Sequence, residues 1–222
     1  MKILTTAAWA AGLAISATAA LAEVSGNVAL TTDYTFRGIS QASELPAIQG
    51  GFDYENDSGF YAGLWGSNVD FGDKVNMELD VYAGFGFETS DDVAFDLGVV
   101  HYQYPGDSGL NYDYTEVYGS VSFFDATVGV NYSPEYFGDT GAFIYAYGEY
   151  SLSLAESWSV DAHVGYNRFE GEEEFGTFLV LPGDSQDDGY VDYSIGVSTE
   201  FDGVGLSLAY VGTNIDDEEC EA

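Results

Sequence analysis

Positive charge is scarce in this sequence. Its 222 residues include 4 Lys and Arg against 38 Asp and Glu, which gives a formal net charge of −34. This excess of negative charge repels nucleic acid phosphates and does not suit a polybasic contact with anionic lipid. Acidic chains can be disordered, but 46% hydrophobic and 16% aromatic residues are too much apolar material for a solvated coil. We therefore expect a folded protein that binds no nucleic acid.

Cysteine and histidine are equally scarce. The single cysteine, Cys220, excludes an intrachain disulfide. The two histidines, His101 and His163, occur without a G-x-S-x-G motif and without a cluster of metal-binding residue types. We therefore expect no enzyme, no cofactor and no metal site, with a Ser-His-acid hydrolase as the least favoured alternative.

Long apolar runs are confined to the start of the chain. The charged residue Lys2 is followed by an apolar run to about Ile15 and by a small-residue A-L-A cleavage box, which are the parts of a secretory signal peptide. The run is short for a membrane-spanning helix, which needs roughly 20 apolar residues. We predict a signal peptide over residues 1–22 and a single domain over residues 23–222.

The remaining chain alternates between apolar and polar residues, with many glycines and tyrosines, and this pattern is typical of β-strands. The alternation is long in residues 24–37, 77–88, 158–167 and 191–201. It predicts about eleven strands of roughly 9–13 residues, the length with which a tilted strand crosses a bilayer. Their expected starts lie near residues 24, 46, 59, 76, 92, 112, 126, 141, 157, 189 and 203.

Two architectures share this alternation. A soluble sandwich or lipocalin-like barrel buries its apolar face, whereas a membrane barrel turns that face to lipid and lines its lumen with polar groups. Strand length and a polar face rich in Gly, Ser, Asp and Glu favour the membrane barrel. Aromatic residues at the strand ends resemble interfacial girdles; they are Tyr34, Phe36, Phe60, Tyr61, Phe85, Phe87, Tyr102, Tyr104, Tyr132 and Tyr210.

In a membrane barrel, the polar face of these strands lines the pore. The candidate pore-lining residues are Asp33, Arg37, Asp53, Glu78, Asp80, Asp96, Glu116, Asp161, Asp192 and Glu200. Rings of carboxylates attract cations and repel anions, which predicts a preference for cations. The alternatives are a polar wall without selectivity and a proteome-wide adaptation to salt. Arg37 either shapes the field of the pore or pairs with a carboxylate, for example Asp33 on the same face.

Other features leave the openness of the pore undecided. Inward Gly and Ser argue for space, whereas bulky inward aromatics argue for plugging; these are Tyr82, Tyr118, Phe143, Tyr145 and Tyr147. Residues 170–188 are predicted to form an acidic surface loop. Within this loop, Asp184 to Gly189 only faintly resembles a calcium-binding loop because the ligand spacing is wrong.

Residues 34–69 carry a more specific signal. Three blocks occur there in order: Y-T-F-R-G-I-S-Q, then P-A-I-Q-G-G-F-D-Y, then G-F-Y-A-G-L-W-G-S-N-V. This arrangement resembles the TorF-like family of proteobacterial outer-membrane porins. The resemblance implies an antiparallel transmembrane β-barrel in the outer membrane of a Gram-negative bacterium and a pore.

Members of that family continue past this point with a last strand that ends in an aromatic residue. Because single-chain bacterial barrels have even strand numbers, a count of eleven predicts a twelve-stranded parent form whose last strand is missing here. The predicted function is passive diffusion of small hydrophilic solutes or cations across an outer membrane. The alternative is a non-conducting structural or surface-binding barrel. The solute and the oligomeric state are not predicted.

Overall fold

The computed structural model describes residues 22–90, 93–155, 157–180 and 187–215. All but the last residue of the predicted signal peptide lies outside these ranges, and so does Cys220.

The regular secondary structure of the described chain is almost entirely β-strand. Eleven strands form one antiparallel sheet in the order β1-β4-β5-β6-β7-β8-β9-β10-β11-β12-β13, and β2 and β3 form a separate hairpin. The strands are β1 (Ala22–Thr31), β2 (Thr35–Phe36), β3 (Ile39–Ser40), β4 (Ala47–Asn56), β5 (Phe60–Asn68), β6 (Met77–Ser90), β7 (Val93–Gln103), β8 (Tyr114–Phe123), β9 (Ala126–Ser133), β10 (Phe143–Ala155), β11 (Trp158–Arg168), β12 (Gly189–Phe201) and β13 (Val204–Thr213). A short helix, α1 (Glu172–Phe178), precedes β12.

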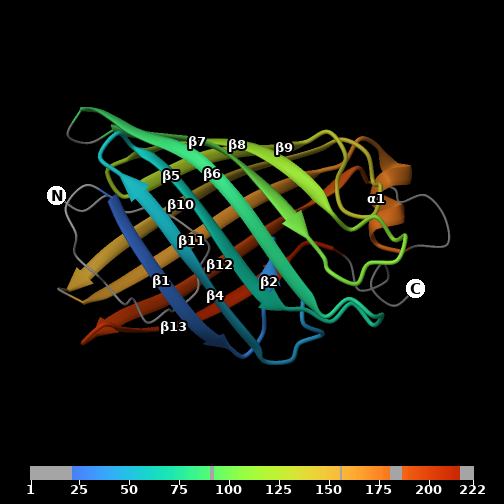
Figure 1. Cartoon of the computed structure of the whole chain (residues 1–222), viewed down its shortest axis with the longest axis horizontal. Helices are drawn as coiled ribbons and strands as arrows, with labels where there is room; N and C mark the ends of the chain where they lie inside the picture. Colours follow the sequence, from blue (N-terminus) through green and yellow to red (C-terminus); the bar gives the residue numbers. More distant parts are fainter. Residues whose placement is uncertain (1–21, 91–92, 156, 181–186, 216–222) are drawn as a thin grey trace.

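The sheet curls into a barrel with two unlike ends (Figure 1). At one end, which we call the turn end, neighbouring strands are joined by two or three residues, as at residues 57–59 and 124–125. At the other, the loop end, the connections are longer, as at residues 104–113 and 169–188. Because eleven strands alternate in direction, the edge strands β1 and β13 both run toward the loop end, and no pairing joins them in the described residues.

The eleven long strands begin within two residues of their predicted starts. Two local predictions were wrong. Residues 24–37 do not form one strand, because β1 ends at Thr31 and the chain then turns into the barrel. Residues 170–188 are not all loop, because α1 forms where three glutamates occupy a first helical turn, a position that favours negative charge.

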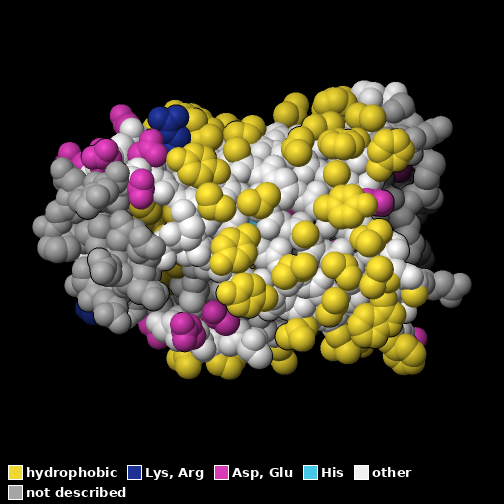
Figure 2. All heavy atoms as spheres, turned by 180° about the vertical axis from the view of Figure 1, so that it is seen from behind, with side chains coloured by type: hydrophobic (Ala, Val, Ile, Leu, Met, Phe, Trp, Pro, Cys, Tyr) yellow, Lys and Arg dark blue, Asp and Glu magenta, His cyan; other side chains and the backbone are white. Residues whose placement is uncertain are grey.

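The apolar faces of the strands point out of the barrel. Large apolar residues in mid-strand are exposed, among them Leu64 at 55% and Leu97 at 57%, whereas Glu78 and Glu116 are 2% and 0% exposed. Figure 2 shows hydrophobic side chains spread over the strands on one face, with most Asp and Glu at the loop end. This is the reverse of a soluble barrel, because burying charge while exposing apolar area is unfavourable in water.

The predicted aromatic girdle is correct only in part. Large aromatic side chains at the turn end, such as Phe60, Phe85 and Phe87, are exposed on the outer surface. Tyr102 and Tyr104 are buried, and Tyr34 and Phe36 pack against the same buried cluster. Aromatic residues therefore serve both as an outer girdle and as filling for the loop end. Among the described residues, no helix is long and apolar enough to cross a membrane.

Glycines opposite inward tyrosines let these rings lie against the barrel wall. Gly84 on β6 faces Tyr61 on β5, and a methyl group added at Gly84 would overlap the tyrosine ring. The Tyr61 hydroxyl lies 2.7 Å from Asp96 Oδ1 and 2.6 Å from the Tyr118 hydroxyl, so the ring cannot move without breaking both contacts. The small residue thus fixes the position of a polar contact across several strands.

We expect Gly84→Ala to lower the free energy of unfolding by about 1–3 kcal/mol, because the added methyl group overpacks the wall. Gly86→Ala on the same strand is the matched control, since a methyl group there would meet only Phe95 O at 3.9 Å. Urea unfolding in detergent micelles compares the two variants. Equal loss of stability in both would show that Tyr61 does not depend on the glycine.

Candidate functional site in the barrel interior

After β1, residues 32–46 fold into the barrel, and we call them the plug segment. Strands β2 and β3 form a tight hairpin whose two turn residues, Arg37 and Gly38, have φ angles of 49° and 81°. Two-residue hairpins of this kind require positive φ at both positions, which glycine adopts easily. A methyl group at Gly38 would lie 2.9 Å from Asp192 Cβ, so the hairpin tip touches the inner wall at β12.

The hairpin places Arg37 at the centre of the loop-end interior. Its Nη1 and Nη2 atoms donate hydrogen bonds of 2.8 Å to Glu116 Oε1 and Oε2 on β8. Such a two-bond pairing of guanidinium and carboxylate is strong and fixes the orientation of both groups. The guanidinium carbon also lies 4.4–5.8 Å from the centroids of four aromatic rings; these belong to Tyr145, Phe36, Phe143 and Tyr136.

We call these partners of Arg37 the arginine cage: Glu116, Phe36, Tyr136, Phe143 and Tyr145. Burial by itself would lower the pKa of the Arg37 guanidinium, but the charge and hydrogen bond of Glu116, together with the nearby Tyr136 and Tyr102, outweigh burial and hold that pKa well above its usual value. Arg37 is therefore a permanent charge. Glu116 also accepts a 2.9 Å hydrogen bond from Asn131, which helps to hold the carboxylate in place without the arginine.

Further contacts anchor the plug segment to other strands. The Tyr34 hydroxyl donates to Glu78 Oε1 on β6 at 3.0 Å, and the Tyr190 hydroxyl on β12 donates to the Arg37 carbonyl at 3.1 Å. Tyr34 packs edge-on against Trp65 on β5, with ring centroids 5.4 Å apart. The plug segment thus contacts strands on several sides of the barrel.

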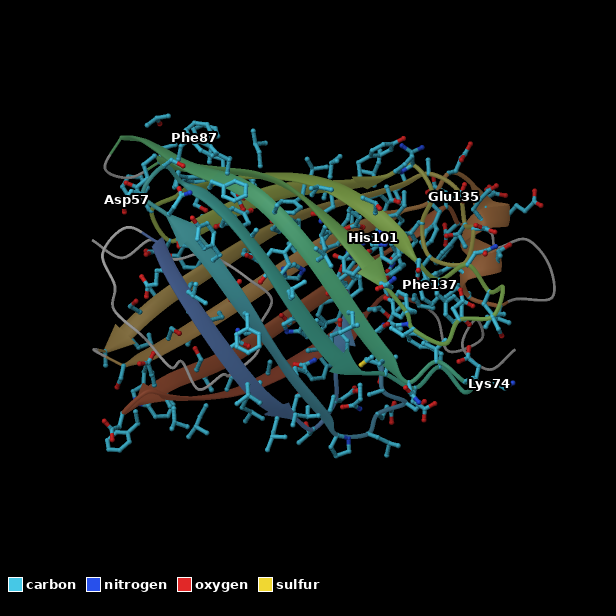
Figure 3. All side chains as sticks on the ribbon, in the orientation of Figure 1. Asp57, Lys74, Phe87, His101, Glu135 and Phe137 are labelled. Carbon is cyan, nitrogen blue, oxygen red and sulfur yellow. The ribbon has the colours of Figure 1, made fainter. Side chains whose placement is uncertain are left out.

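Aromatic side chains fill the rest of the loop-end interior. Tyr136 and Phe143 stack with centroids 3.9 Å apart, and Phe169 packs against Phe143 at 5.0 Å. The helix α1 adds Phe175, which is 1% exposed and lies 5.2 Å from the ring of Phe169. His101 and Phe137 mark this end in Figure 3. At this level the interior is occupied by side chains.

The predicted pore-lining carboxylates occupy two levels. The loop-end level is buried and contains Glu78, Asp80, Glu116 and Asp192. The turn-end level is more open, because Asp53 and Asp96 are half-buried and Glu200 is exposed, although Asp161 is buried.

Hydrogen bonding in the loop-end level is incomplete. Glu78 Oε2 and Asp80 Oδ1 are buried and accept no hydrogen bond within the described part of the chain. Of the cations in the described ranges, Arg37 alone is buried, whereas Lys74 and Arg168 are exposed in or beside the long loops. Within the described ranges, the buried loop-end level therefore holds four carboxyl groups and one guanidinium.

A second polar network lies between the two levels. His163 on β11 has Nε2 2.9 Å from Asp192 Oδ1 and Nδ1 3.2 Å from Glu149 Oε1. The Tyr145 hydroxyl is 2.7 Å from His163 Nε2, and Asn167 donates to Asp192 Oδ2 at 2.7 Å. The network connects the arginine cage, through Tyr145, to the more open half of the interior.

The hypothesis that Arg37 pairs with Asp33 was wrong. Asp33 lies in the plug segment and accepts a 2.7 Å hydrogen bond from Ser40 instead. The pattern suggested Asp33 because a continuous strand would place both residues on one face, but the hairpin turns Arg37 toward Glu116, 79 positions along the chain. Gly38, inside an otherwise alternating stretch, was the available signal for a turn.

Within the described ranges, no group of three or more His, Cys, Asp or Glu is arranged to hold a metal ion. Half of the faint calcium-like loop at Asp184 to Gly189, residues 184–186, lies outside those ranges. What the geometry defines is a polar, acidic interior closed at one end by the chain itself.

An apolar outer surface, an acidic interior and an internal hairpin define a transmembrane β-barrel that carries its own plug. The chain belongs to the family described as "Bacterial protein of unknown function (Gcw_chp)", whose model matches residues 16–221. No match was found among curated proteins.

Several solved structures from Pseudomonas aeruginosa are similar at low identity. The outer membrane protein OprD matches 90% of this chain and 62% of its own, with 10% identity and a TM-score of 0.40. OpdQ matches 89% of this chain and 64% of its own, with 10% identity and a TM-score of 0.43. This chain thus spans less than two thirds of the length of either protein.

Proposed function

We propose that this protein is an outer-membrane channel for passive diffusion of small hydrophilic solutes, with a preference for cations, and that it is not an enzyme. The observation that carries the proposal is an acidic interior inside an apolar outer surface. In bacterial outer-membrane barrels, short turns face the periplasm and long loops face outward. That orientation places the plug segment at the outer side. The resemblance of residues 34–69 to TorF-like porins supports the same function.

The cation preference follows from the field of the wall. The more open, turn-end level offers Asp53, Asp96 and Glu200 to a permeating ion, with no described cation at that level. Carboxylates in a narrow wet pore raise the local concentration of cations and lower that of anions. Selectivity would therefore arise at the turn end, while the plug segment controls access at the loop end.

A planar-bilayer recording under a potassium chloride gradient tests both statements. We expect discrete steps with a reversal potential directed by potassium. Asp53→Asn and Asp96→Asn should each lower the potassium-to-chloride permeability ratio about two- to fivefold, the effect of roughly 0.4–1 kcal/mol for one charge in water. Asp57→Asn, on the exposed β4–β5 turn, is the control with the same change of charge. A chloride-directed reversal potential would refute the cation preference.

The filled loop end specifically favours a second candidate, a barrel that presents its loops and does not conduct. Folding is verified first by the gel shift between unheated and boiled samples. Conductance in the wild type, or only after the plug segment is loosened, supports a channel. Folded protein that stays silent even in plug-loosened variants supports the non-conducting barrel.

A further inference from the structure

The arginine cage has the form of a binding site that the protein fills with its own side chain. Four of its five members belong to the barrel wall and its loops rather than to the plug segment. They are Glu116 on β8, Phe143 and Tyr145 on β10, and Tyr136 in the loop after β9. Only Phe36 arrives with the plug segment. The site would therefore persist if the hairpin moved away.

The chemistry of this cage selects a guanidinium rather than a generic cation. Both carboxylate oxygens of Glu116 accept parallel hydrogen bonds of 2.8 Å, which a planar fork of N–H groups satisfies and a compact ammonium does not. The ring centroids of Tyr145 and Phe143, at 4.4 and 5.0 Å from the guanidinium carbon, favour a flat, weakly hydrated cation.

The Arg37 side chain that fills the cage is held in place by a short hairpin. Strands β2 and β3 have two residues each, and Arg37 adopts a left-handed backbone conformation that is costly for a residue with a side chain. Outside the cage, the tip is held through its Tyr190 hydrogen bond and its contacts with Asp192 on β12 and Thr213 on β13. A ligand that replaced the Arg37 side chain would remove the largest single set of contacts that keeps the hairpin inside.

We propose that the arginine cage is a binding site for small guanidinium-bearing solutes, which compete with Arg37 for Glu116 and thereby release the plug segment. The binding site stands on the geometry of the cage. Its role as a ligand-operated opening of the barrel rests on the proposed function as a channel.

The test uses the full-length barrel with Arg37→Ala, which empties the cage while leaving its wall intact, and methylguanidinium as the probe. Methylammonium at equal ionic strength is the control ligand. We expect methylguanidinium to raise the thermal unfolding temperature of the variant, with an affinity at least about tenfold higher than that of methylammonium because only the former makes two charge-assisted hydrogen bonds. In bilayers it should also reduce the conductance of the variant.

The double variant Arg37→Ala/Glu116→Gln separates cage binding from general effects of the ion. It should lose the preference for methylguanidinium. If the single variant shows no preference, or if the double variant keeps it, the site is refuted. If the single variant refolds poorly, methylguanidinium but not methylammonium should restore the yield, and failure to restore it equally refutes the site.

The experiment gives different results if the cage is not a binding site and if the barrel is not a channel. A variant that conducts but does not respond to methylguanidinium refutes the site and leaves the channel standing. Selective stabilisation in a barrel that never conducts supports the site and refutes the channel.

Discussion

Replacing Glu116 by glutamine is expected to expel the plug segment from the barrel. The change leaves the Arg37 guanidinium buried without a counter-charge, and removing one partner of a buried ion pair typically costs about 3–5 kcal/mol. Moving the hairpin toward the long loops restores hydration of the guanidinium, so expulsion of the hairpin is favoured over unfolding of the eleven-stranded sheet. We expect the single-channel conductance to rise several-fold.

Trypsin reports this movement directly. Arg37 is buried in the folded wild type, whereas Lys74 and Arg168 are exposed and provide internal standards for the activity of the protease. Glu116→Gln should create a new cleavage after Arg37 in folded protein. Glu173→Gln, on the exposed first turn of α1, removes the same charge and should leave Arg37 protected. Continued protection of Arg37 in Glu116→Gln, with unchanged conductance, would mean that the ion pair does not hold the plug.

The second large effect is expected on stability, when an arginine is placed in mid-strand on the outer face of the barrel. Leu97 lies near the middle of β7 and is 57% exposed, so in a bilayer its side chain meets lipid. A charged side chain at the midplane of a barrel costs about 2–4 kcal/mol. We therefore expect Leu97→Arg to make folding into phospholipid vesicles less favourable by that amount.

The control for Leu97→Arg makes the same substitution outside the predicted membrane span. Leu110 is exposed in the long loop after β7, where an arginine is hydrated, and Leu110→Arg should change stability little. Urea titrations of folding in vesicles compare the two variants. Equal, small effects at both positions would show that the outer face of β7 is not in contact with lipid.

Strand positions could be predicted because their cause is local. Alternation with a period of two, interrupted by Gly, Pro and Asp turns, depends on residues within a few positions of one another, so the starts of all eleven long strands followed from pattern. The same locality explains the failure at residues 24–37. The alternation of the sequence continues past Thr31, but the chain leaves the sheet there, and the φ angles of Arg37 and Gly38 then reverse it in a hairpin. Alternation carries no information about either turn.

Contacts between distant segments decided the rest. Alternation does not say which face of a strand points inward. Only the curvature of the sheet puts Leu64 and Leu97 outside and Glu78 and Glu116 inside. The partner of Arg37 was likewise beyond local pattern, because the hairpin brings it to a carboxylate on β8 across the barrel. The sequence by itself therefore determined that each strand has an acidic or polar face and an apolar face, and the tertiary structure decided which face points inward. The plug that closes it exists only because long-range ion pairing and aromatic packing outweigh the cost of burying an arginine.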